Sequence, residues 1–144
     1  MNSKQLGNLT ELQCMTYLYE LGYSISIPFG NADKYDLILD IKDKLYKIQI
    51  KHSSVFLDED GEASYIKFKC TWQSHNTSGY SKQQYKENEI DFFATFYENH
   101  CYLVPWAECC NEKILRIKPP QKIIKKKGIS FLEDYLAEDI ISKL

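Results

Sequence analysis

The 144-residue sequence lacks the features of several classes of protein. It has no apolar run of membrane-spanning length, and its first residues lack the apolar region of a signal peptide. Its five cysteines are an odd number without a C-x-x-C pair, which argues against a disulfide framework and a standard zinc site. We therefore expect a cytoplasmic protein in a reducing compartment, with no membrane partner.

An excess of positive charge is also lacking. The formal net charge is −2 and the isoelectric point is near 5.9. This balance counts against a protein that only coats nucleic acid, but it does not exclude a nuclease, because acids of a metal site offset local lysines. Without repeats or signs of a second domain, we expect one domain over residues 1–144, with residues 119–144 as a C-terminal basic segment and helix.

Residues 35–53 predict two β-strands joined by a tight turn at Asp43-Lys44. Side chains alternate between the two faces of a strand. The first strand therefore places Asp36 opposite its apolar face of Leu37, Leu39 and Ile41, and the second places Lys47, Gln49 and Lys51 opposite Tyr46, Ile48 and Ile50. When the turn closes, a carboxylate, an amide oxygen and an ammonium converge at the same ends of neighbouring strands.

This pattern resembles the PD-(D/E)-x-K nuclease superfamily, and in particular its small group I intron-encoded homing endonucleases. Asp36 matches the acid of the first strand, Gln49 and Lys51 match the acid-x-Lys tripeptide, and Glu11 matches the helix glutamate. Two positions depart from the pattern: Tyr35 stands where Pro is expected, and Gln49 stands where Asp or Glu is usual. The resemblance implies an α/β fold with a restriction-endonuclease-like core, in which helices flank a mixed central β-sheet.

The resemblance also implies phosphodiester hydrolysis with Mg²⁺, for which Mn²⁺ is a possible substitute. Asp36, the side-chain oxygen of Gln49 and the backbone carbonyl of Ile50 would hold the ion. An amide is neutral, so Glu11 would supply the missing charge, directly or through water. Lys51 would orient or help to deprotonate the attacking water and stabilise charge at phosphorus, and we favour the electrostatic role.

The first 22 residues predict a helix that ends at Gly22. Asn8 is the expected cap, and an apolar stripe is expected over Leu9, Leu12, Met15 or Thr16, and Tyr19. Glu11 follows Asn8 by three residues, so it is either the partner in a capping box or a carboxylate of the metal site. The spacing leaves both open, and the resemblance favours the metal site.

Candidate DNA contacts lie downstream. Residues 65–72 predict one alternating strand, whose Lys67 and Lys69 either contact phosphates or only keep that face hydrated. Residues 73–84 predict a polar loop, either a plain long loop or a DNA-contacting one through Gln73, His75, Asn76 and Lys82. The lysines of residues 122–127 form either a solvated linker or a phosphate-contacting arm.

The remaining elements are expected to be structural. Residues 90–97 and 101–105 predict a strand pair in which Asp91 has a structural role rather than a catalytic one. Ser130 and Glu133 predict a capping box that opens a final helix reaching Leu144.

The leading hypothesis is a Mg²⁺-dependent, sequence-specific double-strand DNA endonuclease of intron-homing type that acts at a long target site. One chain holds one site, so cutting both strands implies a homo-oligomer, a dimer or a tetramer. The alternatives are a Holliday-junction resolvase or DNA-repair nuclease on the same core, and a non-catalytic DNA-binding module whose site has decayed at Gln49.

Overall fold

The computed structural model describes residues 1–120 and 128–144, with the side chain of Asn76 left out. The lysine-rich segment expected at residues 122–127 therefore lies outside the described residues. No helix in the described ranges is both long enough and apolar enough to cross a membrane.

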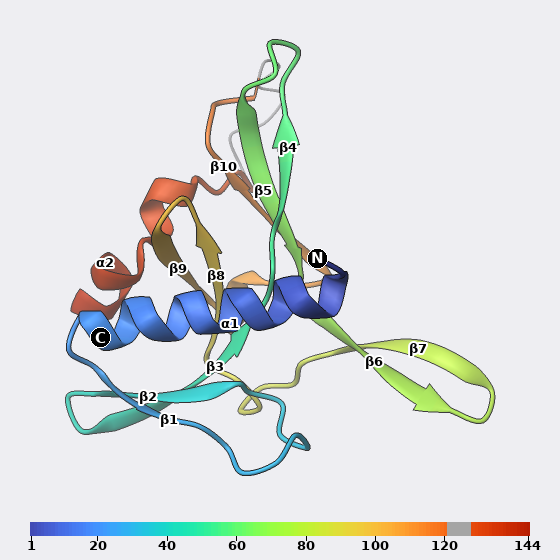
Figure 1. Ribbon diagram of the computed structural model, residues 1–144, viewed down its shortest axis with the longest axis vertical. Helices are drawn as coiled ribbons and strands as arrows, with labels where there is room; N and C mark the ends of the chain where they lie inside the picture. Colours follow the sequence, from blue (N-terminus) through green and yellow to red (C-terminus); the bar gives the residue numbers. More distant parts are fainter. Residues whose placement is uncertain (121–127) are drawn as a thin grey trace.

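A mixed five-stranded sheet forms the centre of the molecule (Figure 1). Its strand order is β1-β2-β3-β8-β9, and only the β3–β8 pair is parallel. Its strands are β1 (Ser24–Ser26), β2 (Leu37–Ile41), β3 (Lys44–Ile50), β8 (Phe92–Tyr97) and β9 (His100–Pro105). Helix α1 (Ser3–Glu20) packs on this sheet, so the α/β class and the mixed central sheet are confirmed.

A second sheet packs on the central one. It contains β4 (Ser54–Leu57), β5 (Ala63–Lys69) and β10 (Glu112–Arg116) in the order β10-β5-β4. Buried Phe68 and Leu115 belong to one cluster with Phe93 and Val104 of the central sheet. Three short helical segments complete the fold, namely η1 (Trp106–Glu108), η2 (Leu132–Tyr135) and α2 (Ala137–Ser142). Of these, η2 and α2 pack against β9.

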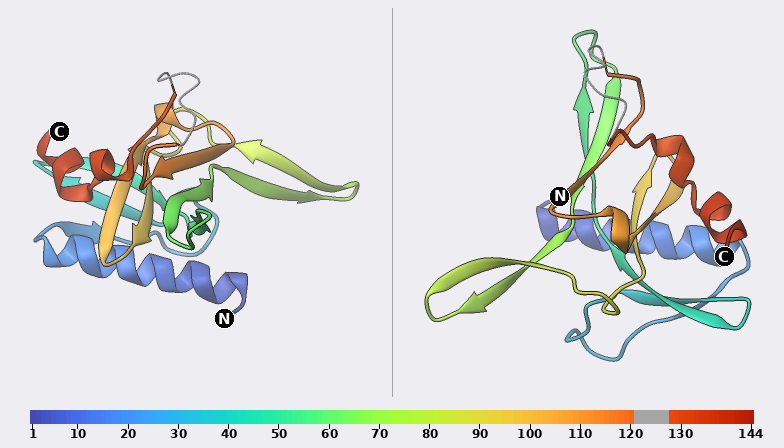
Figure 2. Two further views of the ribbon diagram at one scale, coloured as in Figure 1. Left: turned by 90° about the horizontal axis from the view of Figure 1, so that it is seen from above. Right: turned by 180° about the vertical axis from the view of Figure 1, so that it is seen from behind.

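A two-stranded ribbon projects away from these layers (Figures 1 and 2). It consists of β6 (Thr71–Asn76) and β7 (Gly79–Gln84), paired from Thr71 opposite Gln84 to Asn76 opposite Gly79. The predicted loop at residues 73–84 is therefore wrong, because a ribbon with no buried face lacks the apolar alternation that reveals a strand. The predicted strand over residues 65–72 is also two strands, since β5 ends before Cys70 and β6 begins after it.

The hairpin that carries the site has the predicted faces but a different turn. Lys42 and Asp43 occupy the two central turn positions with φ of 51° and 65°. Positive φ at both positions is the type I′ geometry that matches the twist of a two-residue hairpin. The turn therefore lies one residue earlier than predicted, and Leu37 pairs with Ile48.

Both terminal helices differ from the prediction in how they begin. Asn2 and Gln5 form the capping box of α1, so Asn8 lies inside the helix and caps nothing. Gly22 ends it with a φ of 96°, as expected. At the C-terminus no side chain caps η2 or α2, and the expected single helix is broken at Leu136.

The apolar stripe predicted for α1 is wrong in part, because Met15 packs on the core but Leu9 is exposed. The buried residues are Thr10, Cys14 and Leu18, whereas Leu12 and Tyr19 are 62% and 71% exposed. The side of the helix that packs on β8 and β9 carries Thr10 and Cys14 beside Leu18, and one polar and one small residue among its three buried positions give a weak sequence signal.

Asp91 joins three elements. Its Oδ2 accepts a hydrogen bond from the Lys47 N–H at 2.8 Å, and its own N–H donates to the Lys47 carbonyl at 2.8 Å. Its carbonyl accepts from the Trp106 N–H at 2.9 Å. These bonds tie β3 to the start of β8 and to η1, in agreement with the structural role predicted for this residue.

Replacing Asp91 with Ala leaves the Lys47 N–H without its acceptor. We expect the free energy of unfolding to fall by about 1–3 kcal/mol, the cost of an unsatisfied buried donor. Asp91→Asn keeps an acceptor oxygen and should lose less. Urea denaturation measures both, with exposed Asp40→Ala as the control. Equal stability of Asp91→Ala and wild type would contradict the role given to the carboxylate.

Candidate active site

Asp36 is held at the open end of the β2–β3 hairpin. Its N–H donates to the Ile48 carbonyl at 2.8 Å, and its Oδ2 accepts from the Ile50 N–H at 2.8 Å. Beyond the Leu37–Ile48 pair, the Asp36 carboxylate therefore accepts the hydrogen bond that a backbone carbonyl of β2 would otherwise accept. Among the described residues, the other carboxylate oxygen, Oδ1, has no hydrogen-bond partner, so it is available to a ligand.

The Ile50 carbonyl faces the same edge. The N–H and C=O of one strand residue point to the same neighbouring strand, and the Ile50 N–H points to Asp36. The Gln49 amide nitrogen approaches this carbonyl at 3.5 Å, the outer limit of a hydrogen bond. The structure therefore brings a carboxylate oxygen, a backbone carbonyl and a side-chain amide together.

Lys51 lies beside this group. It follows β3, and its N–H donates to the Ala94 carbonyl at 2.8 Å, which extends the parallel pairing with β8. Its Nζ donates to the Thr71 carbonyl at 2.9 Å and lies 5.2 Å from the centre of the Tyr85 ring. Burial lowers the pKa of the Lys51 ammonium, and the charge of Asp36 partly offsets that shift.

Glu11 approaches the site from α1. Because Asn2 and Gln5 form the capping box, the alternative capping role of Glu11 is wrong. Burial raises the pKa of the Glu11 carboxyl, and the nearby charge of Asp36 raises it further. Glu11 and Asp36 also line one hollow of about 250 Å³. The helix thus brings the second carboxylate near Asp36, as the family pattern implies.

The pKa of Asp36 is also raised, and burial is the largest cause. The Ile50 hydrogen bond and the Lys51 charge oppose this shift without cancelling it. Two carboxylates that are costly to ionise together are the electrostatic setting that a bound cation relieves.

The donor set fits a hard divalent cation. The described residues contain no group of three or more His, Cys, Asp or Glu side chains placed to hold a metal. Mg²⁺ is usually held by one or two carboxylates, with waters and substrate phosphates completing its shell. Two carboxylates and a carbonyl meet that description, and the Gln49 amide, whose nitrogen faces the Ile50 carbonyl, would add its oxygen by turning over. These oxygen donors do not suit a soft metal.

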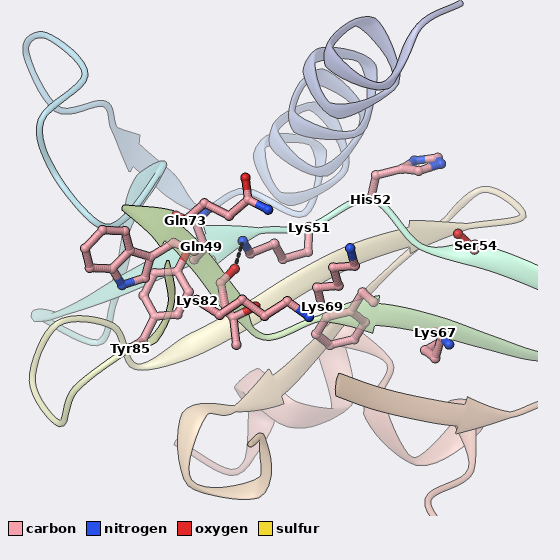
Figure 3. Close-up of a pocket in the computed structure, with 12 residues that line it drawn as sticks. Gln49, Lys51, His52, Ser54, Lys67, Lys69, Gln73, Lys82 and Tyr85 are labelled. Carbon is pink, nitrogen blue, oxygen red and sulfur yellow. Dashed lines mark hydrogen bonds between the residues drawn. The ribbon is translucent and has the colours of Figure 1, made fainter. Parts of the chain in front are cut away.

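A pocket of about 590 Å³ opens next to these groups (Figure 3). Gln49 and Lys51 line it together with four of the predicted DNA contacts, Lys67, Lys69, Gln73 and Lys82. His75 lies farther along the ribbon, where its ring is edge-on to Tyr80 at 4.7 Å. The side chain of Asn76 lies outside the described part of the chain.

Six of the twelve residues that line the pocket were not predicted as site residues, and His52, Tyr85 and Trp72 are three of them. His52 bonds through Nδ1 to the Thr10 hydroxyl at 2.9 Å, and Thr10 also contacts the Leu6 carbonyl at 2.9 Å, so α1 is fastened next to Lys51. Tyr85 packs under Lys51, and Trp72 lies under the Nζ of Lys34 at 3.1 Å from the ring centre. All three act through contacts between distant segments, for which the sequence carries no signal.

Comparison with known proteins gives one consistent result. A family model described as PD-(D/E)XK endonuclease matches residues 1–138. Protein 5.3 of Escherichia phage T7 is 21% identical over 126 residues, which are 87% of this chain and 99% of that protein. The solved structure of a bacterial homing endonuclease, I-Ssp6803I, superposes with a TM-score of 0.74 at 19% identity, covering 99% of this chain and 95% of the other.

The raised pKa of Asp36 predicts how stability depends on pH without divalent ions. The Asp36 carboxyl holds its proton more firmly in the folded protein than in the unfolded chain, where its pKa has the ordinary value of 3.8. The ionised carboxylate therefore costs stability above the raised pKa, and the cost disappears as the pH falls toward 3.8. Asp36→Asn removes the charge but keeps an acceptor for Ile50, so it should stabilise the protein at pH 7 by about 0.5–2 kcal/mol.

Thermal melting with and without millimolar Mg²⁺ completes this test. Mg²⁺ should raise the melting temperature of wild type and leave that of Asp36→Asn almost unchanged, since only the folded wild type binds the ion. Asp40→Asn, on the same strand, serves as the matched control. A Mg²⁺ response that survives in Asp36→Asn would place the ion elsewhere.

Proposed function

This chain belongs to the PD-(D/E)XK endonuclease family, and we propose that it is a Mg²⁺-dependent, sequence-specific double-strand DNA endonuclease of homing type. The observation that carries the proposal is the meeting of Asp36 with the Gln49-Ile50-Lys51 segment at one end of the β2–β3 hairpin. A nuclease is supported by the family itself, and nucleases of this family generally use divalent metals.

The proposed ion would be held by Asp36, the side-chain oxygen of Gln49 and the Ile50 carbonyl, with Glu11 as a ligand directly or through water. When bound, Mg²⁺ or Mn²⁺ supplies positive charge that polarises the phosphoryl group. The raised pKa values of Asp36 and Glu11 favour an ion that offsets two neighbouring negative charges.

Lys51 is the proposed catalytic cation. The Thr71 carbonyl takes one of its three N–H donors and fixes its direction, which leaves two for water and phosphate. In the reaction a water oxygen bonds to phosphorus and releases a proton to solvent, the bond to the leaving sugar oxygen breaks, and that oxygen takes a proton from solvent. Lys51 orients the water and stabilises the negative charge that grows on the phosphate oxygens.

The ribbon is the proposed reader of DNA sequence. A two-stranded β-ribbon fits the major groove of B-DNA. Residues that pair across the ribbon share a face, so Gln73, His75, Tyr80 and Lys82 lie on one side and Trp72, Ser74, Ser81 and Gln83 on the other. The first side continues into the pocket through Gln73 and Lys82. We assign DNA contact to Lys67, Lys69, Gln73, His75 and Lys82, whereas Asn76, predicted from the sequence, follows His75 on the strand and so alternates to the other face.

A homo-oligomer completes the proposal, because one chain offers one site and a double-strand break requires two. Two copies related by a two-fold axis would act on the two strands of a near-palindromic target, and a tetramer would suit a longer one. The exposed apolar side chains of α1, including Leu12 and Tyr19, are a surface that such an assembly would cover.

Cleavage tests the proposed chemistry directly. Wild type should cut DNA selected from a randomised library when Mg²⁺ is present, and Lys51→Ala should slow cutting by about 100- to 1,000-fold, the usual cost of one transition-state donor. Asp36→Asn should bind the same DNA without cutting it. Gel analysis separates nicked from linear product and so reports whether two sites act together.

Asp40→Asn is the control, since Asp40 is exposed on β2, the strand that directly follows Asp36. Equal cutting by Asp36→Asn and wild type would rule out Asp36 as the metal ligand. Faster cutting of four-way junctions than of any duplex would indicate a resolvase, and binding without cutting in both Mg²⁺ and Mn²⁺ would indicate a decayed site.

A matched pair of glutamines tests the ribbon. Gln73→Ala should reduce the preference for the selected sequence over its single-base variants by about 1–3 kcal/mol at one position, the value of a good base contact. Gln83→Ala lies on the other face and should change little. Competition binding in Ca²⁺ measures both, and equal loss of discrimination in the two variants would reject the assigned face.

A further inference from the structure

The outer face of the β10-β5-β4 sheet extends beyond the pocket described above. Pairing across the sheet places Ser54 and Phe56 of β4 beside Lys67 and Tyr65 of β5, and these beside Ile114 and Arg116 of β10. The opposite face carries Ile66, Phe68 and Leu115, which are buried in the core. The outer face is therefore free of the packing that fixes the inner one.

Two cations on this face lie over two stacked rings. The Phe56 and Tyr65 rings are 4.7 Å apart and nearly parallel, at 9°. The Nζ of Lys67 lies 5.0 Å from the Phe56 ring centre, and the Cζ of Arg116 lies 5.0 Å from that of Tyr65. Cation–π contact holds both charges against the sheet and reduces the entropy that they lose on binding a ligand.

Arg116 is the only arginine in the sequence. Its Nε donates to the Lys118 carbonyl at 3.0 Å, and its Nη2 donates to the Ser64 hydroxyl at 3.1 Å. A guanidinium has five N–H donors, so three remain for a ligand in a fixed plane. This planar arrangement matches the oxygens of a phosphate better than a lysine ammonium does.

The acidic partner of Lys67 does not block the face. Glu112 lies 3.6 Å from the Lys67 Nζ, and the two side chains are 48% and 31% exposed. An exposed ion pair of this kind contributes little stability, so a phosphate can replace Glu112 at low cost. Lys67, Lys69 and Arg116 then outnumber Glu112, the acid on β10, while Asp58 and Glu59 line a hollow beside Arg116 at the far end of the face.

This face continues from the pocket of the proposed active site. Ser54, Lys67 and Lys69 line the same pocket as Gln49 and Lys51. Figure 3 shows Lys69 and then Lys67 along β5, leading away from Lys51. Four residue steps from Lys69 to Tyr65 span about 13 Å at about 3.3 Å each, the axial length of about four base pairs of DNA.

We propose that the outer face of the β10-β5-β4 sheet binds the phosphate backbone of duplex DNA next to the cleavage site, with Arg116 as its main contact. This proposal rests on the proposed function, since continuity with the nuclease pocket identifies the ligand. The acidic turn at residues 58–62 limits the face at its far end, where Asp58 and Glu62 hold Lys118.

Arg116→Gln tests the proposal, with Lys113→Gln as the matched control. Lys113 lies on the same strand but pairs with buried Phe68, which places it on the other side of the sheet. Binding is measured by fluorescence anisotropy in Ca²⁺, over a salt series, with duplexes shortened stepwise from each end around the selected cleavage site. Thermal melting confirms that both variants fold.

Arg116→Gln should weaken binding of long duplexes about tenfold and lower the slope of log K against log salt by about 0.9, the loss of one phosphate contact. Short duplexes without the flanking segment should bind wild type and Arg116→Gln equally well. Cleavage at saturating DNA should be unchanged, and Lys113→Gln should resemble wild type throughout.

Equal affinity of Arg116→Gln and wild type for every duplex would overturn the proposal while leaving cleavage, and so the proposed function, intact. The proposal would also be overturned if Arg116→Gln changed the mass of the oligomer but bound DNA as tightly as a wild-type oligomer of the same size. That result would assign the face to contact with a second copy of the chain. Absence of cleavage by the wild-type protein would instead overturn the proposed function.

Discussion

The hydrogen bond from the Ile50 N–H to the Asp36 carboxylate is the interaction on which the site depends. The side chain replaces a backbone acceptor just before β2 begins at Leu37, so the β2–β3 pairing ends in a charged group rather than in another peptide group. That single exchange fixes one carboxylate oxygen and leaves the other unbonded within the described residues. It also directs the Ile50 carbonyl to the same place, because the two polar groups of a strand residue point to one side. The cost of holding the charge in a partly buried position appears in the raised pKa values of Asp36 and Glu11.

The break between β5 and β6 gives the site its second component. Cys70 is buried, and its N–H donates to the Asn111 carbonyl at 2.8 Å, which anchors the chain where it leaves the second sheet. The next residue, Thr71, begins the ribbon and offers its carbonyl to Lys51. One stretch of chain therefore supplies the basic face of β5, the contact that orients the lysine, and the ribbon that projects beyond the pocket.

Much of the central hairpin was predictable because its signal is local. Alternation of Leu37, Leu39 and Ile41 with polar residues determines which face is buried, and a register error of one residue would expose all three. The strand pair before Pro105 and the helix end at Gly22 follow equally from short-range chemistry. The failures are of another kind. The ribbon buries no apolar face among its described side chains, the helix packs through Thr10, Cys14 and Leu18 while Leu12 is exposed, and the C-terminal segment breaks at Leu136, which forms a bridge with Tyr102. The helix face and the break at Leu136 depend on neighbours far away in the sequence, whereas the ribbon is a local hairpin that lacks an apolar pattern.

The sequence by itself determined the residue types of the site, their order and their alternation, because a strand period of two is a property of the backbone and needs no partner. It could not decide whether Glu11 caps a helix or joins Asp36, since both roles have the same spacing, and only the observed cap at Asn2 separates them. Nor could it bring Lys67, Lys69 and Arg116 onto one face with the pocket, because β5 and β10 lie more than 40 residues apart and meet only through the packing of Phe68 and Leu115 on the central sheet. Local sequence determined which polar groups the site contains, and the burial of apolar side chains that are distant in the sequence determined which of these groups lie next to each other.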